Sequence, residues 1–173
     1  MKRRLKYSVL FPILLTIATG STAWSTEVIS EPLARSISST VQPFVVAGGL
    51  ALISDKHEFM QGAKAVGATC LATSILKRVV NEKRPNTDSL TSFPSGHTST
   101  AFAMATVLAE YKPQYKWPAY TLASAIGFSR VEAGSHYWKD VAAGALLGHY
   151  IARHFTKERI VVSPEGVGVQ WKY

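Results

Sequence analysis

The sequence predicts an all-α protein: a compact bundle of about five core helices, followed by a short C-terminal β-hairpin. Two observations lead to this fold class. The chain contains five apolar segments rich in Ala, Leu, Gly and Thr, with too little alternation of apolar and polar residues for strands. It also has 47% hydrophobic and 17% charged residues over 173 positions, which is typical of one domain with a packed core rather than of a disordered chain.

The helices are expected in a regular order after a polar, Ser-rich lead-in that runs from Ser25 to Gln42. The breaks between the apolar segments contain Asp, Pro, Asn or Gly, which are the residues that begin and end helices. We therefore expect helices over residues 43–54, 59–77, 98–111, 117–130 and 140–155.

These segments are short for membrane spans. The charge-free stretches within the last four contain only 12 or 13 residues, whereas a spanning helix needs about 18 or more mostly apolar residues. We expect helices that pack into a globular domain, and the sequence leaves contact with a membrane surface open.

The end of the chain has a different pattern. Residues 159–163 and 166–171 contain Val-Val and Gly-Val-Gly-Val-Gln-Trp, and they flank a Pro-Glu-Gly turn. This arrangement predicts the β-hairpin that closes the domain.

The first 23 residues resemble a secretory signal peptide. Four basic residues precede a short apolar run, which ends in small residues spaced as a cleavage site requires. We expect residues 1–23 to be a signal peptide, with an uncleaved N-terminal anchor as the alternative, and residues 24–173 to form a single helical domain. The protein would then be exported to the periplasm or cell envelope, where it could associate with the membrane.

Removal of a signal peptide on export would change how the net charge and the single cysteine are interpreted. The chain carries a formal net charge of +8, but residues 1–23 hold four of its nineteen basic residues and none of its eleven acidic ones, which leaves +4. This modest surplus, without a basic helix, argues against a nucleic-acid partner. Cys70 lies in an apolar stretch, where we expect a buried small hydrophobic residue.

Five residues in three separate segments are suited to binding a phosphate, four through polar side chains and Gly96 through its backbone. Lys77 and Arg84 can direct two cations at one anion, and Pro85 favours a position for Arg84 beyond the end of the helix. Ser95 and Gly96 open the next predicted helix, whose free N–H groups and dipole favour an anion. Arg130 adds a planar fork for phosphate oxygens.

Two histidines and an aspartate could supply the reactivity. His136 and Asp140 have the i, i+4 spacing of neighbours on one helix face, so the carboxylate can fix the tautomer and leave the other ring nitrogen as a nucleophile. His97, on a different segment, can protonate the leaving oxygen. No third ligand at a suitable spacing indicates a metal site.

Together these segments resemble the three-part signature of the type-2 phosphatidic acid phosphatase superfamily, which also includes bacterial non-specific acid phosphatases and vanadium haloperoxidases. All eleven signature residues are present in order, so coincidence is negligible. They are Lys77, Arg84, Pro85, Pro94, Ser95, Gly96, His97, Ser129, Arg130, His136 and Asp140.

The resemblance implies a helical bundle that hydrolyses phosphate esters without a metal or cofactor. It implies that His136 forms a phosphohistidine, that Asp140 orients it, and that His97 is the acid that later activates water. The residues implied to hold the phosphate are Lys77, Arg84, Ser95, Gly96 and Arg130.

The expected substrate is a phosphomonoester or pyrophosphate, lipid-linked in the leading hypothesis. A broad-specificity soluble acid phosphatase is the alternative; a vanadate-dependent haloperoxidase and a non-catalytic envelope protein have less support. Only eight residues separate Pro85 from Pro94, fewer than the family usually has, which suggests a pared-down domain with an open site. The sequence makes no prediction of the oligomeric state.

Overall fold

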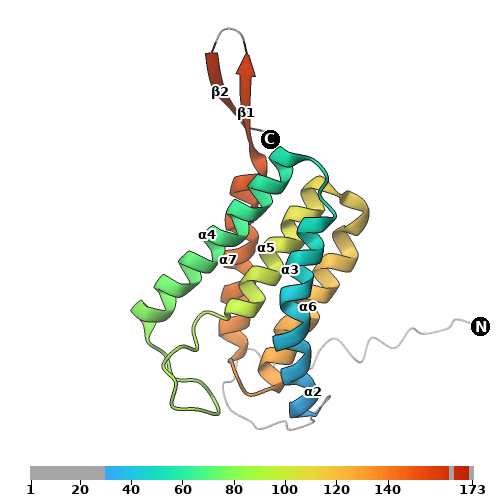
Figure 1. The fold of residues 1–173 in the computed structure, drawn as a ribbon. Coiled ribbons are helices and arrows are strands. Elements are labelled where there is room, and N and C mark those ends of the chain that lie inside the picture. The colour runs from blue at the N-terminus through green and yellow to red at the C-terminus, as the bar shows by residue number, and fades with distance from the viewer. Residues whose placement is uncertain (1–29, 164–165, 172–173) are drawn as a thin grey trace, which may run out of the picture.

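The computed structural model describes residues 30–163 and 166–171, which form a helical bundle with two strands at its C-terminal end (Figure 1). The predicted signal peptide or anchor at residues 1–23 lies outside the described residues. The elements in chain order are α2 (Glu31–Ser36), the π-helical η1 (Ile37–Val41), α3 (Gln42–Ala51), α4 (Lys56–Val80), α5 (Gly96–Tyr111), the 3₁₀ turn η2 (Pro113–Tyr115), α6 (Lys116–Glu132), α7 (Trp138–Lys157), β1 (Glu158–Ser163) and β2 (Gly166–Trp171).

The predicted all-α fold class is confirmed. Each of the five predicted segments corresponds to one of the helices α3 to α7, with ends that differ by a few residues. Among the described helices, none combines the length and the apolar character needed to cross a membrane.

No helix was predicted within the Ser-rich lead-in, but its residues from Glu31 to Val41 are helical and form α2 and η1. Ser39 fits into the helical structure by bonding back to the preceding turn, because its hydroxyl donates to the carbonyl of Arg35 at 2.7 Å. Packing adds to this, because Ala34 is completely buried and α2 contacts α6. Tertiary burial therefore outweighs the weak helix propensity of the serines.

Helix α5 lies in the middle of the bundle, with α3, α4, α6 and α7 packed around it (Figure 1). Its side chains are small and almost all buried from Thr98 to Leu108, which is typical of a helix surrounded by others. Met104 and Val107 form the centre of one apolar cluster, which includes Ile53 from the segment after α3. Apolar burial on most sides of α5 fixes the position of its N-terminus relative to its neighbours.

Two glycines let α7 approach α5 closely. A Cβ atom at Gly144 would lie 2.6 Å from the carbonyl oxygen of Ser95, and one at Gly148 would collide with the carbonyl oxygen of Ser99. Because only glycine fits at these positions, the backbones of the two helices meet beside the start of α5.

Helix α4 has well-defined ends. At its start, the Asp55 carboxylate accepts a hydrogen bond from the Glu58 N–H at 2.9 Å and caps the helix. At its end, Asn81 adopts a left-handed conformation with φ 51°, which asparagine tolerates better than most residues. The chain then leaves the helix axis and enters the loop of residues 82–95.

The C-terminal strands β1 and β2 pair antiparallel, with Glu158 opposite Trp171 and Ser163 opposite Gly166. They extend away from the bundle beyond the end of α7 (Figure 1). Residues 164–165 lie outside the described residues, so the complete hairpin with its turn stays a prediction.

Candidate functional site

The candidate site lies in the lower part of the bundle in Figure 1, where α4 ends and α5 and α7 begin. A cavity of about 310 Å³ opens there. It is lined by Gln42, Cys70, Thr73, Ser74, Lys77, Arg84, Gly96, His97, Thr100 and His136. Five of the eight predicted site residues are therefore brought to one cavity, and Ser95, Arg130 and Asp140 lie outside its lining.

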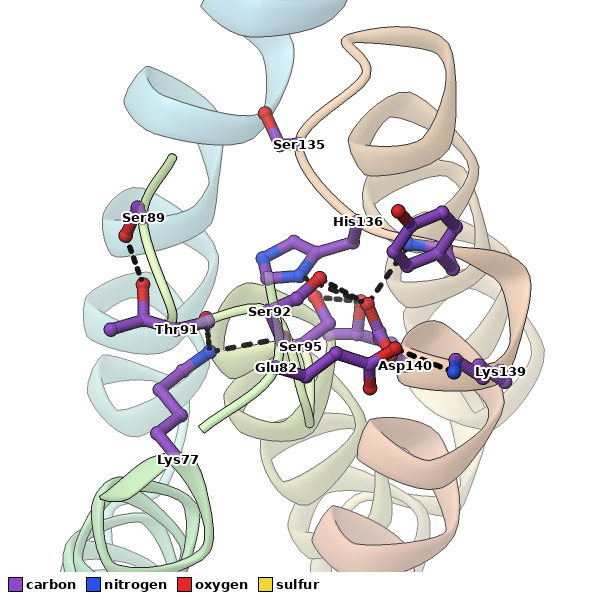
Figure 2. A network of polar contacts seen from close by, with 12 residues as sticks. Lys77, Glu82, Ser89, Thr91, Ser92, Ser95, Ser135, His136, Lys139 and Asp140 are labelled. Carbon is purple, nitrogen blue, oxygen red and sulfur yellow. Dashed lines mark hydrogen bonds and ion pairs between the residues drawn. The ribbon is translucent and has the colours of Figure 1, made fainter. Parts of the chain in front are cut away.

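The two lining cations reach the cavity from different elements. Lys77 lies in the last turn of α4, and its ammonium donates hydrogen bonds to the carbonyls of Thr91 at 2.6 Å and Ser92 at 3.3 Å (Figure 2). Arg84 lies in the loop after α4, as Pro85 predicts.

This loop is held in place by its own contacts. The Ser92 N–H donates to the Glu82 carbonyl at 2.9 Å, and the Glu82 carboxylate pairs with Lys139 of α7 at 2.5 Å (Figure 2). The loop therefore closes against the first turn of α7, which fixes the segment that leads into α5.

The start of α5 presents backbone donors to the cavity. Gly96 and His97 are its first two residues, and the N–H groups of a first helical turn have no partner within their helix. Ser95 occupies the N-cap position and is completely buried. Its N–H donates to the Asp140 carbonyl at 2.9 Å, and its hydroxyl oxygen accepts from the Thr98 hydroxyl at 2.9 Å. Ser95 thus connects α5 to α7 behind the cavity.

His136 and Asp140 lie close together, but not on one helix face as predicted. Helix α7 begins at Trp138, so His136 lies in the preceding turn, where its N–H donates to the Arg130 carbonyl at 3.2 Å. The physical reason is local. The Asp140 carboxylate accepts a hydrogen bond from the Tyr137 N–H at 2.9 Å, so the helix begins directly after Tyr137 and leaves His136 outside it. The distance between His136 Nδ1 and Asp140 Oδ2 is 3.7 Å, too long for a hydrogen bond.

Ser92 makes contacts with three of the predicted residues and was missed by the sequence analysis. It is completely buried, and its hydroxyl donates to Asp140 Oδ2 at 2.5 Å (Figure 2). Its carbonyl accepts from Lys77 at 3.3 Å, and its backbone lies near His136, where it acts to raise the pKa of that ring against the larger effect of burial. No local pattern could have identified it, because its carboxylate partner is 48 residues away in the sequence.

The two histidines are held neutral. Burial is the main cause that lowers the pKa of His97 to about 4 and that of His136 to about 3. Positive charge from Lys77, Arg84 and Arg130 lowers both pKa values further. At neutral pH both rings therefore have a lone pair, which is the form that a nucleophile or a base requires.

Positively charged neighbours also lower the pKa values of Lys77 and Arg130. Burial, and then the charge of Arg84, lowers the pKa of Lys77 to about 8, although Asp140 acts in the opposite direction. Burial and the charge of Arg84 likewise lower the pKa of Arg130, which lies in the last turn of α6, to about 10. An anion bound among these groups would reverse the repulsion, so the arrangement favours a ligand with more than one negative charge.

Unused polar atoms at the site indicate what it could hold. Arg84 Nε, His136 Nδ1 and Asp140 Oδ1 are buried and have no hydrogen-bond partner among the described residues. Within the same part of the chain, no group of three or more His, Cys, Asp or Glu side chains is placed to hold a metal ion. Chemically, the cavity combines cations, helix N–H groups and two neutral imidazoles, which suits phosphoryl transfer to histidine.

Cys70 was expected to be a buried hydrophobic residue, and this prediction is wrong. Its side chain is exposed and lines the cavity, because it lies on the face of α4 that turns toward the site. Gln42 and Thr100 also line the cavity and were not predicted. Gln42 reaches Thr100 across 58 residues of sequence, so spacing alone could not reveal this contact.

Comparison with known proteins shows the same family from sequence and structure. The family model of the PAP2 superfamily matches residues 60–159. A lipid A 1-phosphatase from Porphyromonas gingivalis is 45% identical over 69 residues, which cover 38% of this chain and 16% of that protein. The chain spans less than half of the length of the curated relatives that it matches.

Two solved structures share the fold. The crystal structure of LpxE from Aquifex aeolicus is similar with a TM-score of 0.57 and 28% identity, over 74% of this chain and 94% of that chain. The first transmembrane PAP2 type phosphatidylglycerolphosphate phosphatase from Bacillus subtilis has a TM-score of 0.51 and 22% identity, over 84% of this chain and 92% of that chain. Because the second structure is only 22% identical in sequence, its similarity supports the fold alone.

Proposed function

The chain belongs to the PAP2 superfamily, and from this premise we propose that it is a phosphatase that hydrolyses phosphomonoesters or pyrophosphates, with lipid-linked phosphates as its natural substrates. The observation that carries the proposal is the combination of two neutral histidines with a cation-lined cavity. Neither feature alone specifies phosphoryl transfer, but together they supply a nucleophile, an acid and charge stabilisation.

In the proposed first step, Nε2 of His136 attacks phosphorus. The N–P bond forms while the P–O bond to the leaving group breaks, and protonated His97 gives its proton to the leaving oxygen. His97 acquires that proton when substrate binds, because the negative charge of the phosphate raises its pKa above the low value of about 4. A shift of less than 1 Å would bring His136 Nδ1 within hydrogen-bond distance of Asp140, which then stabilises the positive ring.

In the second step, neutral His97 takes a proton from water as the water oxygen attacks the phosphohistidine. The P–N bond breaks, and inorganic phosphate leaves. Lys77, Arg84 and Arg130 offset the charge on the phosphate oxygens, and the N-terminus of α5 at Ser95 and Gly96 adds backbone donors.

The lipid-linked character of the substrate is supported by the surface of α4. Three of its apolar side chains are exposed by half or more: Leu71 by 64%, Ile75 by 52% and Val79 by 74%. The same helix contributes Lys77 and Ser74 to the cavity, so an apolar surface lies beside the phosphate-binding end. The names of the relatives, among them a lipid A 1-phosphatase, support the same substrate class. We also propose that residues 1–23 are a signal peptide or an N-terminal anchor, and that the protein is exported to the cell envelope.

The test is phosphate release by the purified full chain from phenyl phosphate and from lipid phosphates in detergent micelles. We expect His136→Ala to lower kcat by about a thousandfold or more, because the covalent step is lost. His57→Ala changes an exposed histidine outside the cavity and is the matched control. Vanadate, which imitates the five-coordinate transition state, should inhibit the wild-type protein.

Two results would count against the proposal. Full turnover by His136→Ala would remove the nucleophile assignment. A folded wild-type protein that releases no phosphate from any of these esters would overturn the phosphatase function itself.

A further inference from the structure

The cavity lining contains two chemically different groups of residues. One group consists of the charged and reactive residues that the proposed mechanism uses. The other group, the polar wall, consists of uncharged side chains with small polar groups: Gln42, Cys70, Thr73, Ser74 and Thr100. A phosphate bound to the first group places its leaving group in a cavity that also contains the polar wall.

Gln42 is fixed in one orientation. Its Nε2 donates to the Thr100 hydroxyl oxygen at 2.6 Å, and that hydroxyl donates in turn to the carbonyl of Gly96 at 3.0 Å. Because the Thr100 hydrogen is already used, Thr100 can only accept from Gln42. The Oε1 atom and the second N–H of Gln42 have no partner among the described residues and remain available to a ligand.

The α4 side of this wall also uses its hydroxyl hydrogens internally. Ser74 donates to the Cys70 carbonyl at 2.8 Å. Thr73 bonds to Ser99 at 2.9 Å, and Ser99 donates to the carbonyl of Gly96 at 3.0 Å, so the hydrogen of Thr73 is directed to Ser99. The oxygen of Ser74 is left with acceptor capacity only.

The wall therefore offers acceptors to a ligand, together with a single N–H of Gln42. Acceptors match groups that donate, such as hydroxyls. They do not match a second phosphate, which only accepts when fully ionised, and none of the five side chains of the polar wall carries a positive charge. An ammonium group would meet the repulsion of Lys77 and Arg84 without a carboxylate in the lining.

We propose that Gln42, anchored on Thr100 and assisted by Ser74, forms a leaving-group subsite that selects phosphomonoesters of hydroxylated leaving groups, such as a glycerol or a sugar. The inference rests on the proposed phosphatase function and narrows its substrate class. Gln42 acts as a specificity residue: its Oε1 accepts a hydrogen bond from a leaving-group hydroxyl.

The test compares two esters that differ only in hydroxyl groups, glycerol 1-phosphate and n-propyl phosphate, with pyrophosphate as a third substrate. We expect the wild-type protein to have a higher kcat/KM for glycerol 1-phosphate than for the other two. Gln42→Leu, which preserves the size of the side chain, should lower kcat/KM for glycerol 1-phosphate by roughly three- to tenfold. For propyl phosphate the change should be less than about twofold.

Two further variants complete the design. Gln114→Leu makes the same substitution at an exposed position on η2, outside the cavity, and should change neither rate. Thr100→Val removes the anchor of Gln42 and should reduce the preference for glycerol 1-phosphate in the same direction as Gln42→Leu. Circular dichroism verifies that each variant is folded, and vanadate inhibition verifies that it still binds an anion at the proposed phosphate-binding residues.

The outcomes separate the two proposals. Equal losses on both esters in a folded Gln42→Leu protein would overturn the subsite, because Gln42 would then act only by supporting Thr100 and the start of α5. A wild-type preference for propyl phosphate or pyrophosphate would overturn it as well. Loss of hydrolysis of every ester by the wild-type protein would instead contradict the phosphatase function.

Discussion

Ser92 has an unusual number of contacts for a residue with no proposed chemical role. Its hydroxyl donates to Asp140, its carbonyl accepts from Lys77, and its backbone lies near His136. Besides Ser92, only the Tyr137 N–H donates to the side chain of Asp140 among the described residues. Ser92 is therefore placed as a positioning residue, which acts through the carboxylate that faces His136.

We expect Ser92→Ala to lower kcat by roughly ten- to a hundredfold, because a hydrogen bond to a buried charged group is lost, while KM changes by less than about twofold. The acid limb of the pH–kcat profile should also shift, since the environment of His136 changes. Steady-state kinetics on phenyl phosphate between pH 4 and pH 9 measure both effects. Ser89→Ala, an exposed serine of the same loop, is the control and should behave as wild type. An unchanged pH profile with a general loss of folded protein would mean that Ser92 is only structural.

The elements show which parts of the structure follow from local sequence. The helices α3 to α7 could be predicted, because apolar segments without strand-like alternation, separated by Pro, Asn and Gly, favour helices over other secondary structure. The start of α7 could not: the i, i+4 spacing of His136 and Asp140 suggested one helix, but Asp140 accepts the Tyr137 N–H and the helix begins after His136. Helices α2 and η1 depend on burial of Ala34, a tertiary contact that local propensity does not contain.

The contact between α5 and α7 is the element-level feature most sensitive to substitution. We expect Gly148→Ala to lower the free energy of unfolding by about 1–3 kcal/mol, because the added methyl group meets the backbone of α5 at Ser99. Gly67→Ala, on the exposed side of α4 with nothing within 4 Å, is the matched control and should raise stability by up to about 1 kcal/mol. Urea denaturation of both variants measures the difference. Equal effects from the two substitutions would contradict the close packing of α5 and α7.

At the scale of the whole molecule, the fold class and most of the residues that share the site could be predicted from the sequence. The electrostatics of the site could not. Lys77, Arg84, His97 and His136 share a cavity as expected. The pKa values of Lys77, His97 and His136 depend on how deeply three segments of the chain bury one another, which the spacing of residues does not reveal. The polar wall around Gln42 could not be predicted either, because Gln42 and its partner Thr100 lie on different helices.

The lowered pKa values of the histidines predict that stability falls in acid. The pKa of His97 is about 4 and that of His136 about 3 in the folded protein, against about 6.5 in an unfolded chain. Below about pH 6.5 the unfolded state binds protons that the folded state does not, so the free energy of unfolding decreases as the pH falls toward 4.

Urea denaturation at pH 7 and at pH 4.5 measures this decrease, and His97→Asn should make it smaller, because one of the two titrating groups is removed. Inorganic phosphate should also make it smaller, because a bound anion favours the protonated histidines. Equal stability at both pH values, or a rise in acid, would contradict the neutral state of these rings.

The cluster of Lys77, Arg84 and Arg130 has a consequence for turnover. The groups that attract a phosphate ester also attract inorganic phosphate, the product of its hydrolysis, and the product carries the same charged oxygens without the bulk of the leaving group. The proposed phosphatase would therefore be slowed by its own product, and its output would fall as phosphate accumulates around it. In a phosphate-poor environment this inhibition would be absent, so the rate of hydrolysis would rise as the local concentration of inorganic phosphate falls.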